Sequence, residues 1–106
     1  MIELVKENFD EEVLNYQGVV FVDFWSPKCG PCMELLPEIE AFAAKNEGKA
    51  KFCKLDTAGN KRLAIAQKVM GLPTMVFYKN GEKVQVYDAD NIDIAVMQAK
   101  LDELVG

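Results

Sequence analysis

The chain has 106 residues, half of them apolar, and a net charge of −5. This length fits one domain spanning residues 1–106, and the apolar fraction is sufficient for a buried core. The acidic charge argues against nucleic acid and against an anionic membrane face as partners, and no apolar run is long enough to span a bilayer.

The first half of the chain is expected to form a strand, a helix, a strand and a helix. Ile2–Val5 is a plausible edge strand, and Asn8 with Glu11 resembles the capping box of a following helix. Val19–Trp25 is almost continuously apolar, which is typical of a central strand covered on both faces. Beyond it, apolar residues recur at helical spacing past Pro37, so that proline predicts a kink and not a stop.

The second half is expected to supply a strand, a helix, two strands and a helix: Lys51–Leu55, Lys61–Val69, Thr74–Tyr78, Val84–Tyr87 and Asn91–Val105. Asn80-Gly81 between the two adjacent strands is the strongest short hairpin signal in the sequence. Strands that alternate with helices and then form a hairpin indicate an α/β fold, with a mixed central sheet and helices on both faces.

The most informative stretch is WSPKCGPC, which places Cys29 and Cys32 where a strand ends and a helix begins. Positions three apart on a helix are neighbours, at about 5–6 Å between Cβ atoms, which is close to disulfide reach. The helix N-terminus and the cation of Lys28 both favour a thiolate, so we predict a Cys29 pKa below the usual value of about 8.5. Cys29 would then attack a substrate disulfide, and Cys32 would resolve the mixed disulfide.

The residues between the cysteines fit this chemistry. Pro31 restricts the turn and is tolerated in a first helical turn, and Gly30 leaves room for a substrate backbone. Two other interpretations stay open: a zinc site shared between two chains, and two inert thiols. Zinc sites usually have four ligands, whereas the chain has no histidine and only Cys53 besides the pair.

Asp23 is the second candidate site residue, because a carboxylate inside an apolar strand is costly to bury unless it is paired or protonated. It shares one strand face with Trp25 and could accept a proton from Cys32. Alternatively, backbone donors satisfy it. Lys54, on the next expected strand, either compensates this charge or is simply exposed.

Four segments together resemble the thioredoxin family, in order and along essentially the whole chain: FVDFWSPKCGPC, KLD at Lys54–Asp56, GLPT at Gly71–Thr74 and YKNGEKV at Tyr78–Val84. The resemblance implies a thioredoxin fold with about five strands in a mixed sheet flanked by four helices. It also implies a protein-disulfide reductase that carries electrons through a reversible Cys29–Cys32 disulfide, needs no bound cofactor or metal, and is recharged by an external thioredoxin reductase.

The resemblance also assigns roles to single residues. It makes Cys29 the attacking thiol, Cys32 the resolving thiol, Asp23 the proton acceptor and Lys54 its neighbour. It makes Pro73 a cis-proline that faces the disulfide, although nothing local in the sequence indicates a cis bond there. The residues that it places on the substrate surface are Trp25, Gly30, Pro31 and Leu72.

Two positions on the expected docking rim depart from the family. Lys28 stands where most thioredoxins have tryptophan, and Asp88-Ala89-Asp90 replaces a small glycine-containing loop, with Ala89 at its centre. These charges would alter partner choice more than chemistry. Lys28 either stabilises the Cys29 thiolate and steers an acidic partner, or is an exposed lysine without a role.

The expected partners are thioredoxin reductase and disulfide-containing client proteins. KRLAIAQKVMGLPT resembles the atypical thioredoxins that serve glycine reductase in amino-acid-fermenting anaerobes, which adds glycine reductase components as possible clients. An odd cysteine count and an N-terminus without secretory features favour a cytoplasmic protein. A monomer is expected together with the resemblance. An oxidant or isomerase, and a non-catalytic binding module that uses the groove around Pro73, remain as alternatives.

Overall fold

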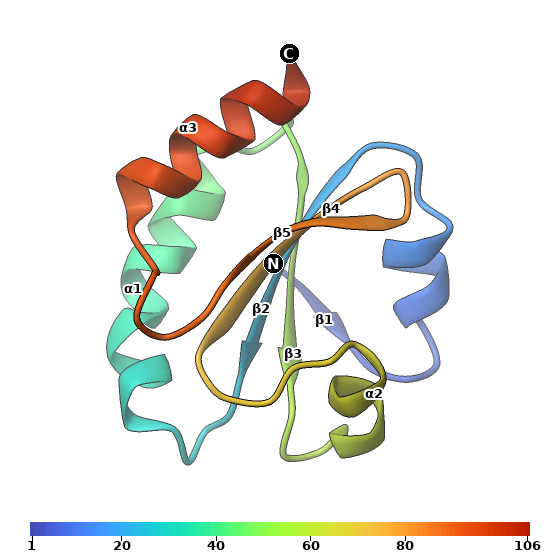
Figure 1. Cartoon of the computed structure of the whole chain (residues 1–106), viewed down its shortest axis with the longest axis vertical. Coiled ribbons are helices and arrows are strands. Elements are labelled where there is room, and N and C mark those ends of the chain that lie inside the picture. Colours follow the sequence, from blue (N-terminus) through green and yellow to red (C-terminus); the bar gives the residue numbers. More distant parts are fainter.

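A computed structural model describes residues 1–106 and shows a five-stranded sheet between two layers of helices (Figure 1). The strands lie in the order β1-β3-β2-β4-β5. β1, β3 and β2 run parallel, whereas β4 runs antiparallel to both β2 and β5. Their bounds are β1 Ile2–Leu4, β2 Val19–Trp25, β3 Lys51–Asp56, β4 Thr74–Lys79 and β5 Glu82–Tyr87.

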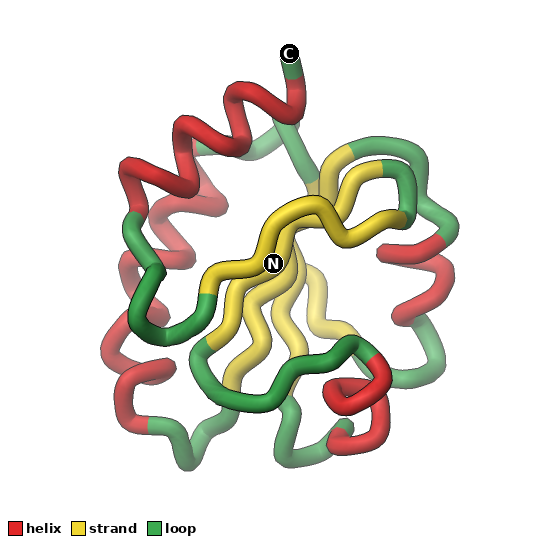
Figure 2. The backbone as a smooth tube through the Cα atoms, viewed as in Figure 1, coloured by secondary structure: helices red, strands yellow, loops and turns green.

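Four helices cover the two faces of the sheet: η1 Asp10–Leu14, a π-helical turn, α1 Gly30–Lys45, α2 Lys61–Ala66 and α3 Ile94–Val105. Figure 2 shows α1 and α3 on one side of the strands and η1 and α2 on the other. Each side has its own core cluster of buried side chains. The prediction of an α/β fold with a mixed five-stranded sheet and four helices is confirmed.

The central strand β2 explains why the two clusters form one core. Every residue of β2 except Trp25 is buried. Because successive side chains of a strand point to opposite faces, Phe21 lies in the cluster under α1 and α3, and Val22 lies in the cluster under η1 and α2. The continuous apolar run in the sequence is therefore the consequence of burial on both faces.

The first helix differs from the prediction at its start. The Asn8 side chain accepts a hydrogen bond from the Val5 N–H and donates one to the Glu3 carbonyl, so it faces back along the chain. No side chain caps η1. The expected capping box of Asn8 and Glu11 is wrong, because the Asn8 side chain bonds to the backbone of the preceding residues Glu3 and Val5 and not to the helix.

Two further helix boundaries are also shifted. α2 ends at Ala66, earlier than the apolar pattern predicts, and Lys68 has a left-handed φ of 62° that no α-helix continues through. α3 begins at Ile94, because the Asp93 side chain accepts a hydrogen bond from the Val96 N–H and caps it. α1, in contrast, continues through Pro37 as expected.

The β4–β5 hairpin turn is fastened to the loop before β2. Asn80 and Gly81 have φ angles of 52° and 83°, as this type of tight turn requires. The Asn80 side chain accepts from the Gly18 N–H and the Asn80 N–H donates to the Gly18 carbonyl, both at 2.9 Å. A methyl group on Gly81 would overlap the Leu14 carbonyl oxygen. The turn thus requires glycine for its conformation and for close contact.

We expect Gly81→Ala to lower the free energy of unfolding by about 2–4 kcal/mol, from a left-handed backbone and a displaced carbonyl together. Gly48→Ala is the matched control, since Gly48 also has a positive φ, 88°, but a methyl group there meets no atom within 4 Å. It should cost only about 1–2 kcal/mol. Urea denaturation of both variants measures the difference; equal losses would show that the contact with Leu14 contributes nothing.

Candidate active site

The two cysteines occupy the junction between β2 and α1. Cys29 is the N-cap residue of α1, and Cys32 lies in its first turn. They form a disulfide, with 5.2 Å between their Cα atoms. Cys29 is partly exposed, whereas Cys32 retains only 4% of its accessible surface. A substrate can therefore reach the sulfur of Cys29 more readily than that of Cys32.

One backbone N–H of α1 points at the sulfur of Cys29. The Cys32 N–H donates to the Cys29 Sγ at 3.2 Å, which is the position of a capping hydrogen bond. Pro31 lies in the first turn, where the N–H that it lacks would have no helical acceptor. A methyl group on Gly30 would meet no atom within 4 Å, so no contact inside the chain requires glycine there.

Asp23 is buried in β2 with only 2% of its surface accessible. By strand alternation its side chain lies on the α1 face of the sheet, like that of Phe21. Its Oδ1 has no hydrogen-bond partner. Burial raises the pKa of this carboxyl to about 7, with a smaller opposing effect from the positive charge of Lys54. A carboxyl group that titrates near neutral pH is suited to accept and release protons.

Lys54 and Trp25 lie beside this carboxyl. Lys54 is the β3 residue paired with Asp23, yet its ammonium forms no ion pair with the carboxylate. It lies 5.5 Å from the centre of the Trp25 ring, within cation–π range. The Trp25 indole N–H is buried without a partner, and the Trp25 carbonyl accepts hydrogen bonds from Thr57. The hydrogen bonds of Trp25 with Thr57 thus involve its backbone carbonyl, and its indole N–H makes no hydrogen bond.

The loop before β4 lies next to this junction. Thr74 pairs with Phe24 near the end of β2, which places the Leu72–Pro73 peptide beside the chain that leads to Cys29. This peptide bond is cis. The Thr74 hydroxyl donates to the Gly71 carbonyl at 2.7 Å and closes the loop. Leu72 packs against the cluster under η1 and α2, so its side chain is anchored in the core.

The two positions that depart from the family pattern are exposed. Lys28 extends from the loop before Cys29 into solvent. Ala89 lies at the tip of a turn in which the Asp88 carboxylate accepts from the Asn91 side chain and the Asp90 N–H. Because β5 runs parallel to β2, this turn lies at the same edge of the sheet as the cysteine junction.

Sequence reasoning missed Ser26 as part of this site. Ser26 is buried, its carbonyl accepts from the Cys29 N–H at 3.0 Å, and its hydroxyl accepts from the Lys28 N–H at 3.2 Å. These two hydrogen bonds fix the conformation of the loop between β2 and Cys29. A serine before a proline is a recognisable turn signal, and it could have identified this residue.

The third cysteine is separate from the redox pair. Cys53 is free and fully buried on β3, and burial raises the pKa of its thiol to about 12. No group of three or more histidine, cysteine, aspartate or glutamate side chains is arranged to hold a metal ion. The chain therefore offers no complete zinc site of its own, and Cys53 acts as a small apolar side chain.

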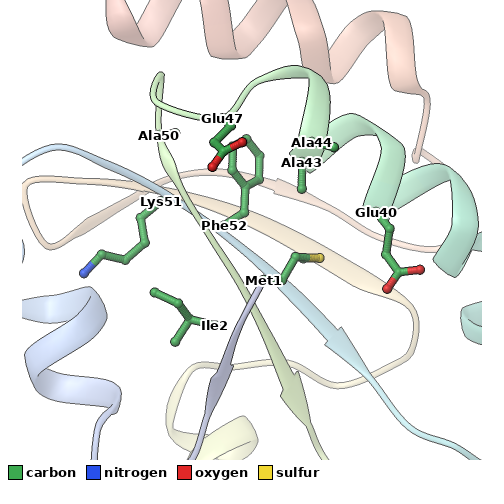
Figure 3. Close-up of a pocket in the computed structure, with 9 residues that line it drawn as sticks. All are labelled: Met1, Ile2, Glu40, Ala43, Ala44, Glu47, Ala50, Lys51 and Phe52. Atoms are coloured by element: carbon green, nitrogen blue, oxygen red, sulfur yellow. The ribbon is translucent and has the colours of Figure 1, made fainter.

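A hollow of about 590 Å³ lies away from the cysteines, between the start of β1, the second half of α1 and the start of β3 (Figure 3). Met1, Ala43 and Phe52 supply apolar atoms, while Glu40 and Lys51 lie at its sides. Neither cysteine nor Asp23 lines it. The cysteine pair therefore lies outside this hollow, at the end of the sheet where β2 leads into α1.

Comparison with known proteins is consistent with this geometry. Residues 1–103 match the sequence model of the thioredoxin family. The chain is 42% identical to a thioredoxin of Peptoclostridium acidaminophilum, over all of this chain and 96% of the other. It is 40% identical to a thioredoxin of Acetoanaerobium sticklandii, over 99% of this chain and 100% of the other.

A solved structure, that of a mutant thioredoxin from Halobacterium salinarum, superposes with a TM-score of 0.85. It is 28% identical, and the alignment covers 99% of this chain and 90% of that one. None of the helices in this chain has the length and hydropathy needed to cross a lipid bilayer.

The burial of Asp23 predicts a pH-dependent cost in stability. Its pKa is about 7 when folded against 3.8 for an ordinary carboxyl, so only the unfolded chain loses the proton between these values. Stability falls as the pH rises through this window, by up to about 4 kcal/mol. We expect Asp23→Asn to stabilise the oxidised protein by several kcal/mol at pH 8 and by little at pH 3.

Urea denaturation at the two pH values tests this expectation. Asp10→Asn, which removes an exposed carboxylate from η1, is the control for the same substitution at the surface. An Asp23→Asn gain that does not change with pH would mean that Asp23 ionises normally in the folded protein.

Proposed function

The chain belongs to the thioredoxin family of thiol–disulfide oxidoreductases, and we propose that it reduces client disulfides with Cys29 as nucleophile and Cys32 as resolving thiol. The observation that carries this assignment is the disulfide at the N-terminus of α1, with one sulfur accessible and the other buried. The redox group is this cysteine pair, and the family requires no bound cofactor.

The reaction has two exchange steps. The Cys29 thiolate attacks one sulfur of the client disulfide, a Cys29–client bond forms, and the other client sulfur leaves and takes up a proton. The Cys32 thiolate then attacks the Cys29 sulfur, the intramolecular disulfide forms as the Cys29–client bond breaks, and the second client sulfur leaves and takes up a proton. Two electrons pass to the client, which ends as a dithiol.

Asp23 is proposed to accept the proton that Cys32 must lose before the second step. Three observations support this role: the carboxyl lies on the α1 face of β2, its Oδ1 has no partner, and its pKa is about 7. Lys54 lowers that pKa and keeps it near neutrality. Lys28 and the first turn of α1 are proposed to stabilise the Cys29 thiolate.

The client polypeptide is proposed to lie across the edge of the sheet where the loops converge. The open space above Gly30 admits a backbone, and Pro31 beside it is exposed. The cis Leu72–Pro73 peptide beside β2 leaves Leu72 with backbone groups for an extended peptide. Trp25 and Ala89 would complete the contact surface.

We further propose that residues 1–106 act as one monomeric, cytoplasmic domain, recharged by an external thioredoxin reductase. A single sheet with a core cluster on each face supports one domain, and the free buried Cys53 fits a compartment in which structural disulfides do not persist. The resemblance of residues 61–74 adds components of glycine reductase to the proposed clients.

Cysteine variants test the assigned roles. Cys29→Ser should abolish the acceleration of insulin reduction by dithiothreitol, because the accessible thiol that attacks the client disulfide is then missing and the remaining thiols are buried. Cys32→Ser should reduce it by at least about 100-fold and accumulate a mixed disulfide that non-reducing electrophoresis and mass spectrometry detect. Cys53→Ala is the control and should keep nearly full activity. If both cysteines can be replaced without loss of cellular function, the chain is a binding module.

The equilibrium redox potential separates a reductant from an oxidant or isomerase. We expect a potential well below that of the glutathione pool, about −220 to −260 mV by extraction methods. Trp25 is the only tryptophan and adjoins the site, so its fluorescence can follow the titration, with alkylation and mass spectrometry as a check. A value well above the pool would assign the protein to disulfide donation.

A further inference from the structure

Positive charge is concentrated in one part of this acidic protein. Residues 57–81 contain no aspartate or glutamate, whereas the whole chain has a net charge of −5. Lys61, Arg62 and Lys68 lie in or next to α2 within this segment. All three are exposed, and none forms an ion pair with another residue of the chain. Their charges are available to a partner.

Large apolar side chains lie among these cations. Ile65 is 65% exposed on α2, and Met70 is 89% exposed in the loop that follows. The opposite side of α2 faces the core, where Ala64 is buried and Leu63 packs against the cluster under η1 and α2. Ile65 therefore contributes little to the packing of α2 against the sheet. Single exposed apolar residues are common, but here two are combined with unpaired cations.

This surface is continuous with the proposed substrate groove. Lys61, Ile65, Met70 and Leu72 line the same open hollow of about 230 Å³. Leu72 belongs to the cis peptide beside the cysteine junction. Figure 1 shows α2 and the loop to β4 at the same end of the sheet as the start of α1. A polypeptide bound at the cysteines can thus extend onto α2.

We propose that Lys61, Arg62, Ile65 and Met70, here called the α2 face, form a docking surface for an acidic segment with apolar side chains on disulfide-bearing partner proteins. Opposite charge accelerates the encounter and fixes orientation, and the apolar side chains contribute contact area. The effect of the α2 face on the rate of disulfide reduction rests on the proposed function. Binding of a partner at the α2 face does not, because it needs no redox step.

The probes are synthetic peptides that share one disulfide loop and differ in a tail of Glu-Leu, Glu-Gly or Gly-Ser repeats. Reduced protein should reduce the Glu-Leu peptide about tenfold faster than the Gly-Ser peptide at an ionic strength of about 0.01 M. The advantage should shrink at about 0.15 M, where the screening length falls to about 8 Å. Fluorescence titration with the same peptides carrying serine for cysteine measures binding without exchange.

The variant K61E/R62E should remove the advantage of the acidic tails and leave the rate for the Gly-Ser peptide unchanged. K45E/K49E is the matched control, because it changes the net charge equally near the far end of α1. It should keep the advantage. Ile65→Asn should weaken binding of the Glu-Leu tail more than binding of the Glu-Gly tail.

Equal loss in both double variants, or no loss in K61E/R62E, would overturn the α2 face as a docking surface. Equally tight binding of a single-stranded oligonucleotide would overturn the choice of a protein partner, and self-association that K61E/R62E abolishes would assign the face to a second copy. If no peptide is reduced but the serine Glu-Leu peptide binds the wild type and not K61E/R62E, the proposed function fails and the docking surface stands.

Discussion

The site depends on one unfavourable arrangement, a carboxyl group buried in the central strand without a full set of hydrogen bonds. Asp23 lies in a strand whose other side chains form the core on both faces, and one of its oxygens has no partner. Its charged form is therefore costly, and its pKa rises to about 7. Two apolar clusters offset this cost.

Topology brings the remaining parts of the site to that carboxyl. β2, β3 and β5 all point the same way, so the segments that follow them meet at one edge of the sheet. β4 runs in the opposite direction, and the cis Leu72–Pro73 peptide therefore enters at the same edge. The start of α1 supplies the Cys32 N–H, which has no acceptor within the helix and donates to the Cys29 sulfur. The site is therefore formed by the ends of several strands and by the start of α1, and not by one element alone.

The parts of this arrangement that follow from local chemistry could be predicted from the sequence. The bounds of β2 follow from its apolar run, and the hairpin turn follows from Asn80-Gly81, because these residues tolerate a positive φ. The early end of α2 could not be predicted, since Val69 is packed against the core without being helical. The capping role predicted for Asn8 is wrong because its side chain has two possible sets of backbone partners.

The same limit applies to the site. That Asp23 must be buried follows from its strand, but that it lacks a partner depends on where the Lys54 ammonium lies, and this cation lies over Trp25 instead. The Ser26-Pro27 pair marks a turn in the sequence, but Ser26 positions Cys29 through its backbone carbonyl, a contact that does not depend on the identity of the side chain. Backbone hydrogen bonds and buried polar atoms without a partner depend on how the whole chain is folded, so they cannot be predicted from local sequence patterns.

Chemistry and recognition are carried by different parts of the surface. The Cys29 sulfur accepts a hydrogen bond from the first turn of α1, and the Asp23 carboxyl is buried in β2, so we expect the redox potential of the pair to depend on these surroundings. The unpaired charges of α2 lie outside that environment, at the end of the groove. Charged residues at the rim of an interface act mostly on the rate of encounter and on the choice of partner. Substitutions on α2 can therefore change which disulfides are reduced without changing the driving force for reducing them.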